Sequence, residues 1–185
     1  MSDDEPEASW ITLASEVVYK APPWIRVRRE RIRTGSGVQI DDFYRIEASD
    51  FVLVYALDED GRAILLRQWR QGPQRFAFSF PGGHVESGES PEEAGLRELQ
   101  EETGYKADGL EFLGRFSMHS NFHIGWGHFY RALGAVVKVA ERGSQDFERA
   151  TVSLLDSAAL DRALSDGCLI TVHDALCARL GVRRR

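Results

Sequence analysis

Short apolar runs, separated by charged or glycine-containing turns, dominate the chain from residue 10 onward. They predict strands at 15–20, 24–32, 38–48, 51–57, 62–69, 76–80, 110–118, 127–139 and 151–154. The Asp-Glu-Asp-Gly sequence at 58–61, between two of these runs, is typical of a hairpin turn. Apolar residues at helical spacing predict helices at 155–165 and 169–180. This order of elements indicates a mixed sheet with helices on its faces.

One segment, residues 83–105, departs from this pattern because it is strongly acidic. Its sequence, GHVESGESPEEAGLRELQEETGY, contains seven carboxylates and a single base, Arg97. On a helix, residues three and four apart share a face, so Glu98, Glu101 and Glu102 converge on one patch. Hard divalent cations prefer carboxylate oxygens, which makes Mg²⁺ or Mn²⁺ the natural partner of this patch.

Local signals set the ends of the helix in this acidic segment. Ser90 and Glu93 form a capping box at its start, and Gly104 is a suitable stop. Ala94 and Gly95 come about one turn before the acidic patch. We expect them to lie beside it, where their small side chains leave room for an ion or a ligand.

The alternative interpretation of the segment is a solvated surface helix that is rich in glutamate. Three observations favour a metal site instead. The acids do not alternate with Lys or Arg, three of them share one face, and they follow a glycine-rich loop. That loop in turn follows the apolar strand predicted at 76–80.

The same segment resembles the Nudix box, the signature of the Nudix hydrolases. The fixed positions of the signature are matched here by Gly83, Glu89, Arg97, Glu98, Leu99, Glu101, Glu102 and Gly104. Tyr105 departs from it, because the family prefers an aliphatic residue there. The resemblance implies an α/β (α+β) fold, the Nudix αβα sandwich, in which helices flank a mixed β-sheet. We expect this domain to cover residues 49–182.

Breaking a pyrophosphate linkage requires charge neutralisation and a positioned water, which divalent ions supply. We expect four groups to form the metal shell: the carboxylates of Glu98, Glu101 and Glu102, and the carbonyl oxygen of Gly83. Glu101 would be a further or water-mediated ligand. The resemblance implies that Arg97 orients the glutamates by ion pairing and that Glu89 fixes the loop to the helix.

Candidates for the general base come from the same resemblance. In the ADP-ribose branch of the family, a carboxylate on a loop before the last strand activates the water. The corresponding segment here, residues 141–148, contains Asp146 and Glu148. An acidic surface loop accounts for these two residues equally well, and Glu101 is the rival base within the box.

Substrate contacts are suggested by two arginines and an aromatic loop. The branch resemblance implies that Arg67 and Arg70 contact phosphates; the alternative is pairing with surface acids. In the loop 119–126, Phe122 and Trp126 would stack on a base or shape a sugar pocket; the alternative is core or lid packing. Ser79 stands where the ADP-ribose branch commonly has Glu, which weakens the specific assignment of ADP-ribose.

The segment before residue 49 divides into two parts. Residues 1–9 are expected to be disordered, and residues 10–48 to form an antiparallel β extension. The extension resembles the N-terminal sheet of the ADP-ribose pyrophosphatase branch. In that branch such strands help to build a homodimer, with the substrate near the interface. The resemblance therefore implies a homodimer.

Composition narrows the class of protein. The net charge of −6, from 23 basic and 29 acidic residues, argues against a general nucleic-acid or anionic-membrane binder. No apolar stretch reaches the length of a membrane span, and the acidic start lacks the features of a signal peptide. Cys168 and Cys177 have no metal-like spacing and are expected to be reduced. We therefore expect a soluble cytoplasmic protein.

Together these features predict a Mg²⁺-dependent Nudix hydrolase. It would cleave the pyrophosphate of a nucleoside diphosphate linked to another group, with ADP-ribose or a nucleotide sugar as first choice. Two alternatives stay open. One is a nucleoside triphosphate pyrophosphohydrolase, and the other is a ligand sensor of the same fold without turnover.

Overall fold

The computed structural model describes residues 9–134, 136–139 and 150–182. The chain divides into two compact units. The first unit joins the residues up to Ser49 with a later loop, Ser117–Trp126, and the second comprises Asp50–Phe116 and the residues from Gly127 onward. By its packing, the loop belongs with the N-terminal strands, a relation that the linear order of the sequence does not reveal. Disorder was expected for residues 1–9, and residues 1–8 of this segment lie outside the described residues.

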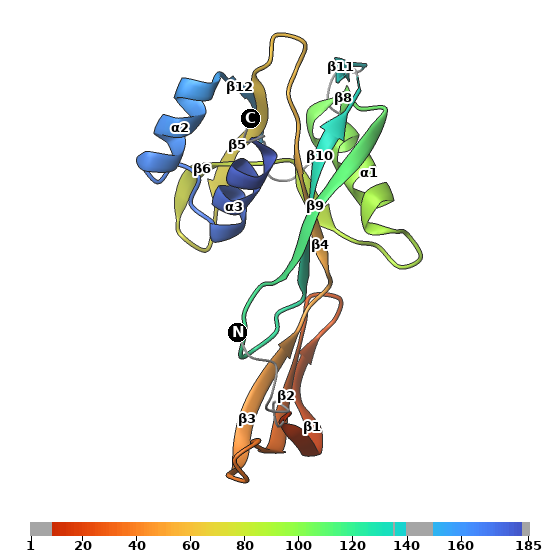
Figure 1. Ribbon diagram of the computed structural model, residues 1–185, viewed down its shortest axis with the longest axis vertical. Helices are drawn as coiled ribbons and strands as arrows, with labels where there is room; N and C mark the ends of the chain where they lie inside the picture. Colours follow the sequence, from red (N-terminus) through yellow and green to blue (C-terminus); the bar gives the residue numbers. More distant parts are fainter. Residues whose placement is uncertain (1–8, 135, 140–149, 183–185) are drawn as a thin grey trace, which may run out of the picture. The chain divides into compact units, whose positions relative to one another are not determined.

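The first unit contains an antiparallel sheet of three strands (Figure 1). In the order β1-β2-β3, these are Ile11–Ala21, Ile25–Arg33 and Gln39–Glu47. All three predicted strands are confirmed, with β1 beginning four residues earlier than expected. The loop is tied to the sheet by the backbone N–H of Ile46, which donates to the carbonyl of Phe122 at 2.9 Å.

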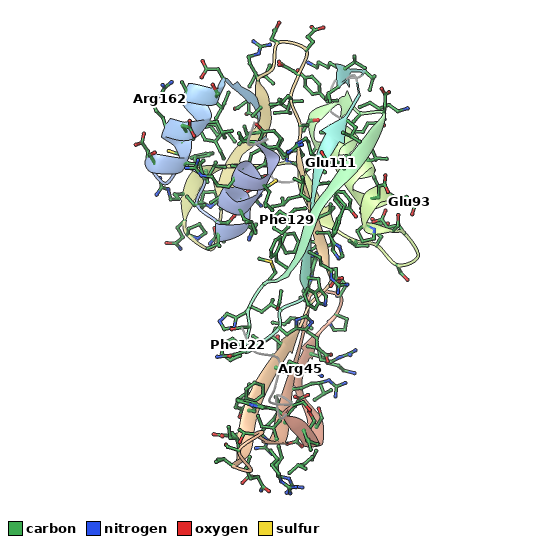
Figure 2. The ribbon with its side chains drawn as sticks, in the orientation of Figure 1. Arg45, Glu93, Glu111, Phe122, Phe129 and Arg162 are labelled. Atoms are coloured by element: carbon green, nitrogen blue, oxygen red, sulfur yellow. The ribbon has the colours of Figure 1, made fainter. Side chains whose placement is uncertain are left out.

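Charged side chains, more than apolar ones, connect the strands of this sheet. The carboxylate of Glu30 is almost fully buried, and it accepts a hydrogen bond from Ser15 at 3.2 Å. It also pairs with Arg45 at 3.1 Å, which lies on the neighbouring strand β3 (Figure 2). A buried carboxylate is costly unless it is paired, so these contacts hold the three strands in register.

The second unit is built from short strands and three helices. In chain order they are β4 Phe51–Tyr55, β5 Ala63–Arg70, β6 Arg75–Ser79, β7 Gly82–His84, α1 Pro91–Thr103, β8 Tyr105–Lys106, β9 Gly109–Ser117, β10 Trp126–Leu133, β11 Val137–Lys138, β12 Thr151–Leu155, α2 Ser157–Ser165 and α3 Val172–Gly181. The main sheet has the order β7-β4-β10-β9, and a second sheet has the order β12-β5-β6. Strand β10 runs parallel to β4, whereas β7 is antiparallel to it, so the sheet is mixed, as predicted.

Alternating residues of β4 serve two separate apolar cores. Val52 and Val54 are fully buried toward α1, in the core that also contains Leu99. Leu53 and Tyr55 point the other way, toward α3, and pack in a core with Phe129 (Figure 2). This two-residue alternation places α1 on one face of the strand and α3 on the other, which gives the layered αβα arrangement of the unit. Among the described helices, none is long and apolar enough to cross a membrane.

Helix α1 begins and ends where the sequence predicts. The hydroxyl of Ser90 accepts from the N–H of Glu93 at 3.2 Å, and the Glu93 carboxylate accepts from the N–H of Ser90 at 2.7 Å. At the other end Gly104 has a φ of 75°, and its N–H donates to Gln100. The reciprocal capping bonds satisfy two backbone donors that the first turn of a helix otherwise leaves unpaired.

The expectation that Ala94 and Gly95 lie beside the acidic patch is wrong. Both residues are buried against the sheet. A Cβ at Gly95 would lie 2.7 Å from the Leu110 side chain and 3.2 Å from those of Val52 and Val54. Gly95 therefore serves the close approach of α1 to the sheet rather than leaving space for a ligand.

We predict that Gly95→Val lowers the free energy of unfolding by about 1–3 kcal/mol, because the added methyl groups overpack the contact between α1 and β4. Urea denaturation measures the effect. Gln100→Val is the matched control, since it places the same side chain on the exposed face of the same helix. Equal stability losses in the two variants would contradict the close packing described for Gly95.

Candidate active site

Arg97 organises the acidic segment. Its Nε and Nη2 atoms donate to the two carboxylate oxygens of Glu89, at 3.2 Å and 2.8 Å. Its Nη1 donates to Glu98 at 2.8 Å and to Glu101 at 3.2 Å. Nη2 also donates to the carbonyl of His84 at 3.2 Å. One guanidinium thus joins α1 to strand β7 and to the loop between them.

Burial and ion pairing act in opposite directions on these carboxylates. Burial raises the pKa of Glu98, while hydrogen bonding and charge from Arg97 oppose that rise. The hydrogen bonds from Arg97 lower the pKa of Glu89, which also accepts from the N–H of Glu86 at 2.6 Å. The pKa of Arg97 itself is raised, first by its bond to Glu89. The site therefore contains a half-buried carboxylate whose negative charge requires a cation.

Two glycines allow the glutamates to reach the backbone of β7. The carboxylate of Glu102 accepts from the N–H of Gly82 at 2.8 Å. A Cβ at Gly83 would lie 2.2 Å from Oε1 of Glu98. Any side chain at Gly83 would therefore displace that carboxylate, which explains why this position has none.

The donor set suits a hard divalent cation, although the carboxylates have other partners in this arrangement. Among the described residues, no three His, Cys, Asp or Glu side chains form a metal-site cluster. The reason is that Arg97 pairs with Glu98 and Glu101, while Glu102 turns toward Gly82. The residues suit a divalent cation because carboxylate oxygens from one helix face the glycine backbone of β7. The most buried of these carboxylates, that of Glu98, has a negative charge that burial destabilises and a cation would stabilise.

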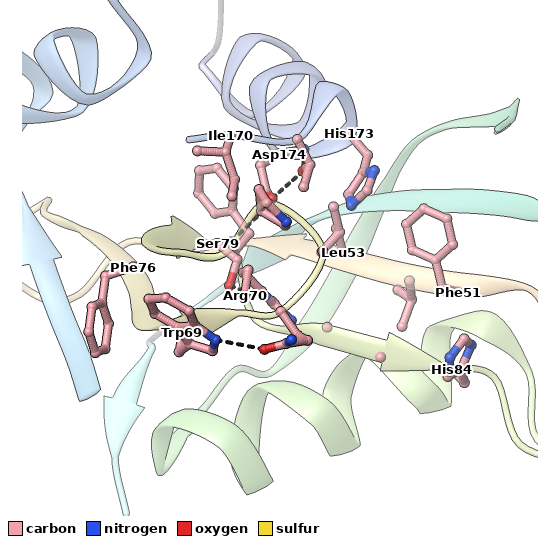
Figure 3. Close-up of a pocket in the computed structure, with 18 residues that line it drawn as sticks. Phe51, Leu53, Trp69, Arg70, Phe76, Ser79, His84, Ile170, His173 and Asp174 are labelled. Carbon is pink, nitrogen blue, oxygen red and sulfur yellow. Dashed lines mark hydrogen bonds between the residues drawn. The ribbon is translucent and has the colours of Figure 1, made fainter. Parts of the chain in front are cut away.

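A cavity of about 790 Å³ lies beside the same glycines (Figure 3). Its lining includes Gly82 and Gly83 from β7, Phe51 from β4, Arg70 from β5, and His173 from α3. Apolar and aromatic walls with a few convergent polar groups are typical of small-molecule sites. The glycines thus separate this cavity from the carboxylates of α1.

Asp174 connects the C-terminal helix to the strand that leads into the glycines. It is 2% exposed, and its carboxylate accepts from the N–H of Phe80 at 2.9 Å and from the hydroxyl of Thr171. Burial raises its pKa. Also in the cavity lining, Nη2 of Arg70 donates to the hydroxyl of Ser79 at 3.0 Å. The polar groups of the cavity are thereby held in place by residues from β5, β6 and α3.

The structure brings together some of the residues predicted from sequence and separates others. Glu98, Glu101, Glu102, Arg97 and Gly83 form one cluster. Arg70 lines the adjacent cavity, whereas Arg67 lies outside its lining, with its guanidinium 4.8 Å from the ring centre of Phe76.

The remaining candidates are two aromatic residues of the first unit and two acidic residues. Phe122 (Figure 2) and Trp126 belong to the first unit, where Phe122 stacks on His119 and Trp126 packs edge-on against His123. The proposed bases, Asp146 and Glu148, lie outside the described residues.

Sequence reasoning missed the residues that reach the cavity from far along the chain, above all His173 and Asp174. A local signal was present: Thr171 followed three residues later by Asp174 is a helix N-cap pattern, and the Thr171 hydroxyl accepts from the N–H of Asp174 at 3.1 Å. This pattern places the start of α3 at Val172, later than the predicted residue 169. It does not reveal which strand the helix covers.

Two family profiles match the sequence. Residues 49–165 match the NUDIX domain, and residues 10–46 match the nucleoside diphosphate sugar hydrolase N-terminal domain. The first match covers more than half of the chain, so this protein belongs to the NUDIX domain family. Hydrolases of this family generally use divalent metal ions.

Curated relatives match over shorter segments. An ADP-ribose pyrophosphatase of Bacillus subtilis is 39% identical over 71 residues, which are 38% of each chain. A methanol dehydrogenase activator of Bacillus methanolicus is 33% identical over 97 residues, 52% of each chain. A mouse (Mus musculus) ADP-sugar pyrophosphatase is 52% identical over 48 residues, 26% of this chain and 22% of its own. The chain thus spans about half or less of the length of these relatives.

A solved structure confirms the fold over nearly the whole chain. The crystal structure of an ADP compounds hydrolase superposes with a TM-score of 0.80 at 22% identity. The match covers 93% of this chain and 91% of the other. The predicted Nudix fold, with helices flanking a mixed sheet, is therefore confirmed.

We predict that Arg97→Met lowers the free energy of unfolding by about 1–3 kcal/mol, because it leaves the half-buried Glu98 carboxylate without its partner. A carboxyl group with a raised pKa favours the folded state when protonated, so the loss should shrink as pH falls through the pKa of Glu98. Urea denaturation across a pH series measures both effects. In Arg97→Met/Glu98→Gln the two losses should be less than additive, whereas full additivity would contradict the coupling.

Proposed function

We propose that this protein hydrolyses the pyrophosphate bond of a nucleoside diphosphate linked to another group, and that it requires Mg²⁺, with Mn²⁺ as a possible substitute. The observation that supports this most directly is the cluster at β7, where Arg97 holds glutamates of α1 against a glycine backbone. A pyrophosphate is a dense anion, and a cluster of carboxylates binds it only through cations. The neighbouring cavity then accepts the rest of the substrate.

ADP-ribose or a nucleotide sugar is the proposed substrate, with a nucleoside monophosphate and a sugar phosphate as products. Two findings support this choice. Relatives include proteins named ADP-ribose pyrophosphatase and ADP-sugar pyrophosphatase, and residues 10–46 match a nucleoside diphosphate sugar hydrolase domain. Compact triphosphatases usually lack such an extension, so the triphosphate alternative is less well supported.

Each residue of the cluster has a proposed role. Glu98 and Glu102, one helical turn apart, would hold the metal, with Glu101 and the carbonyl of Gly83 completing its shell. A bound divalent ion would polarise the phosphoryl oxygens and lower the pKa of the attacking water. Arg97 would keep the carboxylates in position.

Three carboxylates remain candidates for the base that accepts the proton of the attacking water. Glu101 is supported by its position: its side chain is 62% exposed, so solvent reaches it. Asp146 and Glu148 are supported only by the family resemblance. For substrate contacts, Arg70 is supported by its place in the cavity beside the glycines, while Arg67, Phe122 and Trp126 remain predictions from the sequence.

We predict that Glu102→Gln abolishes turnover while the protein stays folded, because the amide removes a charged metal ligand. The assay supplies ADP-ribose, nucleotide sugars, dinucleotides and triphosphates with Mg²⁺ or Mn²⁺, and chromatography identifies the products. Glu92→Gln is the matched control, since Glu92 is exposed in the first turn of α1 and contacts none of the cluster residues named above.

The outcomes separate the candidate functions. Release of AMP and ribose 5-phosphate from ADP-ribose, lost in Glu102→Gln and retained in Glu92→Gln, supports the proposal. Turnover of triphosphates alone would favour the pyrophosphohydrolase. Metal-dependent turnover that persists in Glu102→Gln would overturn the residue assignment, and ligand binding without any turnover would favour a sensor.

A homodimer formed through the N-terminal sheet is part of the proposal. Support comes from exposed aromatic side chains in and around β1. Trp10 directly before the strand, Tyr19 within it and Trp24 in the turn after it expose 59%, 57% and 69% of their surfaces. Exposed apolar patches on this scale commonly mark interaction surfaces. The family resemblance of residues 10–48 points to the same use.

We predict a dimer in sedimentation velocity at micromolar concentration. Tyr19→Lys should shift it toward monomer, because a charge replaces an aromatic ring at the interface. Val172→Lys is the control, since Val172 is also exposed but lies on α3. A wild-type monomer would refute this part of the proposal.

A cytoplasmic location completes the proposal. Cys168 and Cys177 are both free thiols, and Cys177 is buried. Free thiols suit a reducing compartment. Fluorescence of a tagged chain in its native cell tests this location.

A further inference from the structure

Two histidines of the cavity have no assigned task. His84, on β7, and His173, on α3, both line it, and neither ring forms a hydrogen bond with any described residue. His173 is partly buried, and a ring in such a place normally finds a partner for its nitrogens, whereas His84 is exposed at the mouth of the cavity. The nitrogens of both rings are therefore available to a ligand.

An aromatic side chain lies between these histidines. Phe51 is the direct cross-strand partner of His84 in the pairing of β4 with β7, so the two side chains share one face of the sheet. The ring centres of Phe51 and His173 are 5.2 Å apart. The three rings therefore follow one another along one wall of the cavity, with Arg70 and Ser79 on another (Figure 3).

The chemistry of this wall suits a hydroxyl-bearing group better than a second phosphate. Burial lowers the pKa of His173; the charge of the neighbouring Asp174 opposes this shift, and the positive charge of Arg70 adds to it. A neutral imidazole offers one donor and one acceptor, which matches the donor and acceptor capacity of a hydroxyl. The face of Phe51 offers apolar contact to the C–H groups of a sugar ring.

The position of the cavity fixes which part of a substrate it can hold. Gly82 and Gly83 line it, and the same two residues contact Glu102 and Glu98. Strand β7 is the edge strand of the order β7-β4-β10-β9, so a phosphate bound by cations at the carboxylates lies beside the free edge of the sheet. A group attached to that phosphate can extend around this edge into the cavity.

We propose that His173, together with Phe51 and His84, forms a subsite for the sugar attached to the pyrophosphate, in which the His173 imidazole hydrogen-bonds a sugar hydroxyl. This inference rests on the proposed function and deepens it, since it makes His173 a specificity-determining residue. It explains discrimination between a nucleotide sugar and a nucleoside diphosphate ester that has no hydroxyls beyond the pyrophosphate.

The test compares two substrates, ADP-ribose and the propyl ester of ADP, which keeps the nucleotide and the pyrophosphate but lacks the sugar. In His173→Phe, kcat/KM for ADP-ribose should fall roughly three- to tenfold, the effect of one lost neutral hydrogen bond, while that for the propyl ester stays unchanged. His173→Gln, which keeps a donor and an acceptor, should recover part of the loss.

Val172→Phe is the matched control. It places the same phenyl ring on the neighbouring residue of α3, which is 83% exposed and does not line the cavity. Both substrates should be cleaved at wild-type rates. An equal loss for both substrates in His173→Phe would mean a structural role for the histidine and would overturn the subsite, as would no loss for either.

A binding measurement separates this inference from the proposed function. Calorimetry with ribose 5-phosphate and with propyl phosphate, on wild type and His173→Phe, requires no turnover. Tighter binding of ribose 5-phosphate that disappears in the variant would support the subsite even if ADP-ribose were not cleaved, and the hydrolase proposal alone would then fall. Equal binding of the two phosphates by wild type would overturn the subsite.

Discussion

The second unit depends on one cation, the guanidinium of Arg97. Like charges three and four residues apart on a helix repel one another, and α1 places several glutamates at such spacings. Arg97 bonds two of them, Glu98 and Glu101, and also Glu89 of the preceding loop and the carbonyl of His84. The contact to Glu89 holds the loop, the contact to His84 holds strand β7, and the other two orient the helix face. Without this cation, the carboxylates would have no common geometry, and the glycine backbone beside them would lose its connection to the helix.

The second constraint is the close packing of α1 against the sheet and of its carboxylates against β7. Glycines at three positions make this packing possible because they have no side chain. Gly95 lets α1 approach β4, which brings the acidic face close to β7. Gly82 and Gly83 then let carboxylates contact the backbone of β7 from one side while the cavity opens on the other. The same two glycines therefore border the cavity and contact the carboxylates of Glu102 and Glu98. A side chain at Gly83 would displace the Glu98 carboxylate.

Capping residues and apolar runs in the sequence predicted much of this arrangement, but they could not predict contacts between residues far apart in the chain. The capping residues fixed both ends of α1, and apolar runs located the longer strands, because both depend on neighbours in sequence. Strands β7, β8 and β11 have only two or three residues, too few for a periodic pattern. Whether Gly95 faces the sheet or the acidic patch depends on which face of α1 packs on the sheet. The positions of the charged residues in the sequence did not determine that face. His173 reaches the cavity through tertiary packing, which a single sequence does not display.

The bond between Asp174 and the N–H of Phe80 joins residues 94 positions apart in the chain. During synthesis, the acidic helix and the glycine strand emerge well before the segment that completes the cavity. A nascent chain therefore carries the acidic helix and the glycine strand before it carries α3. The cavity lacks the wall that α3 supplies until the C-terminal segment has been synthesised.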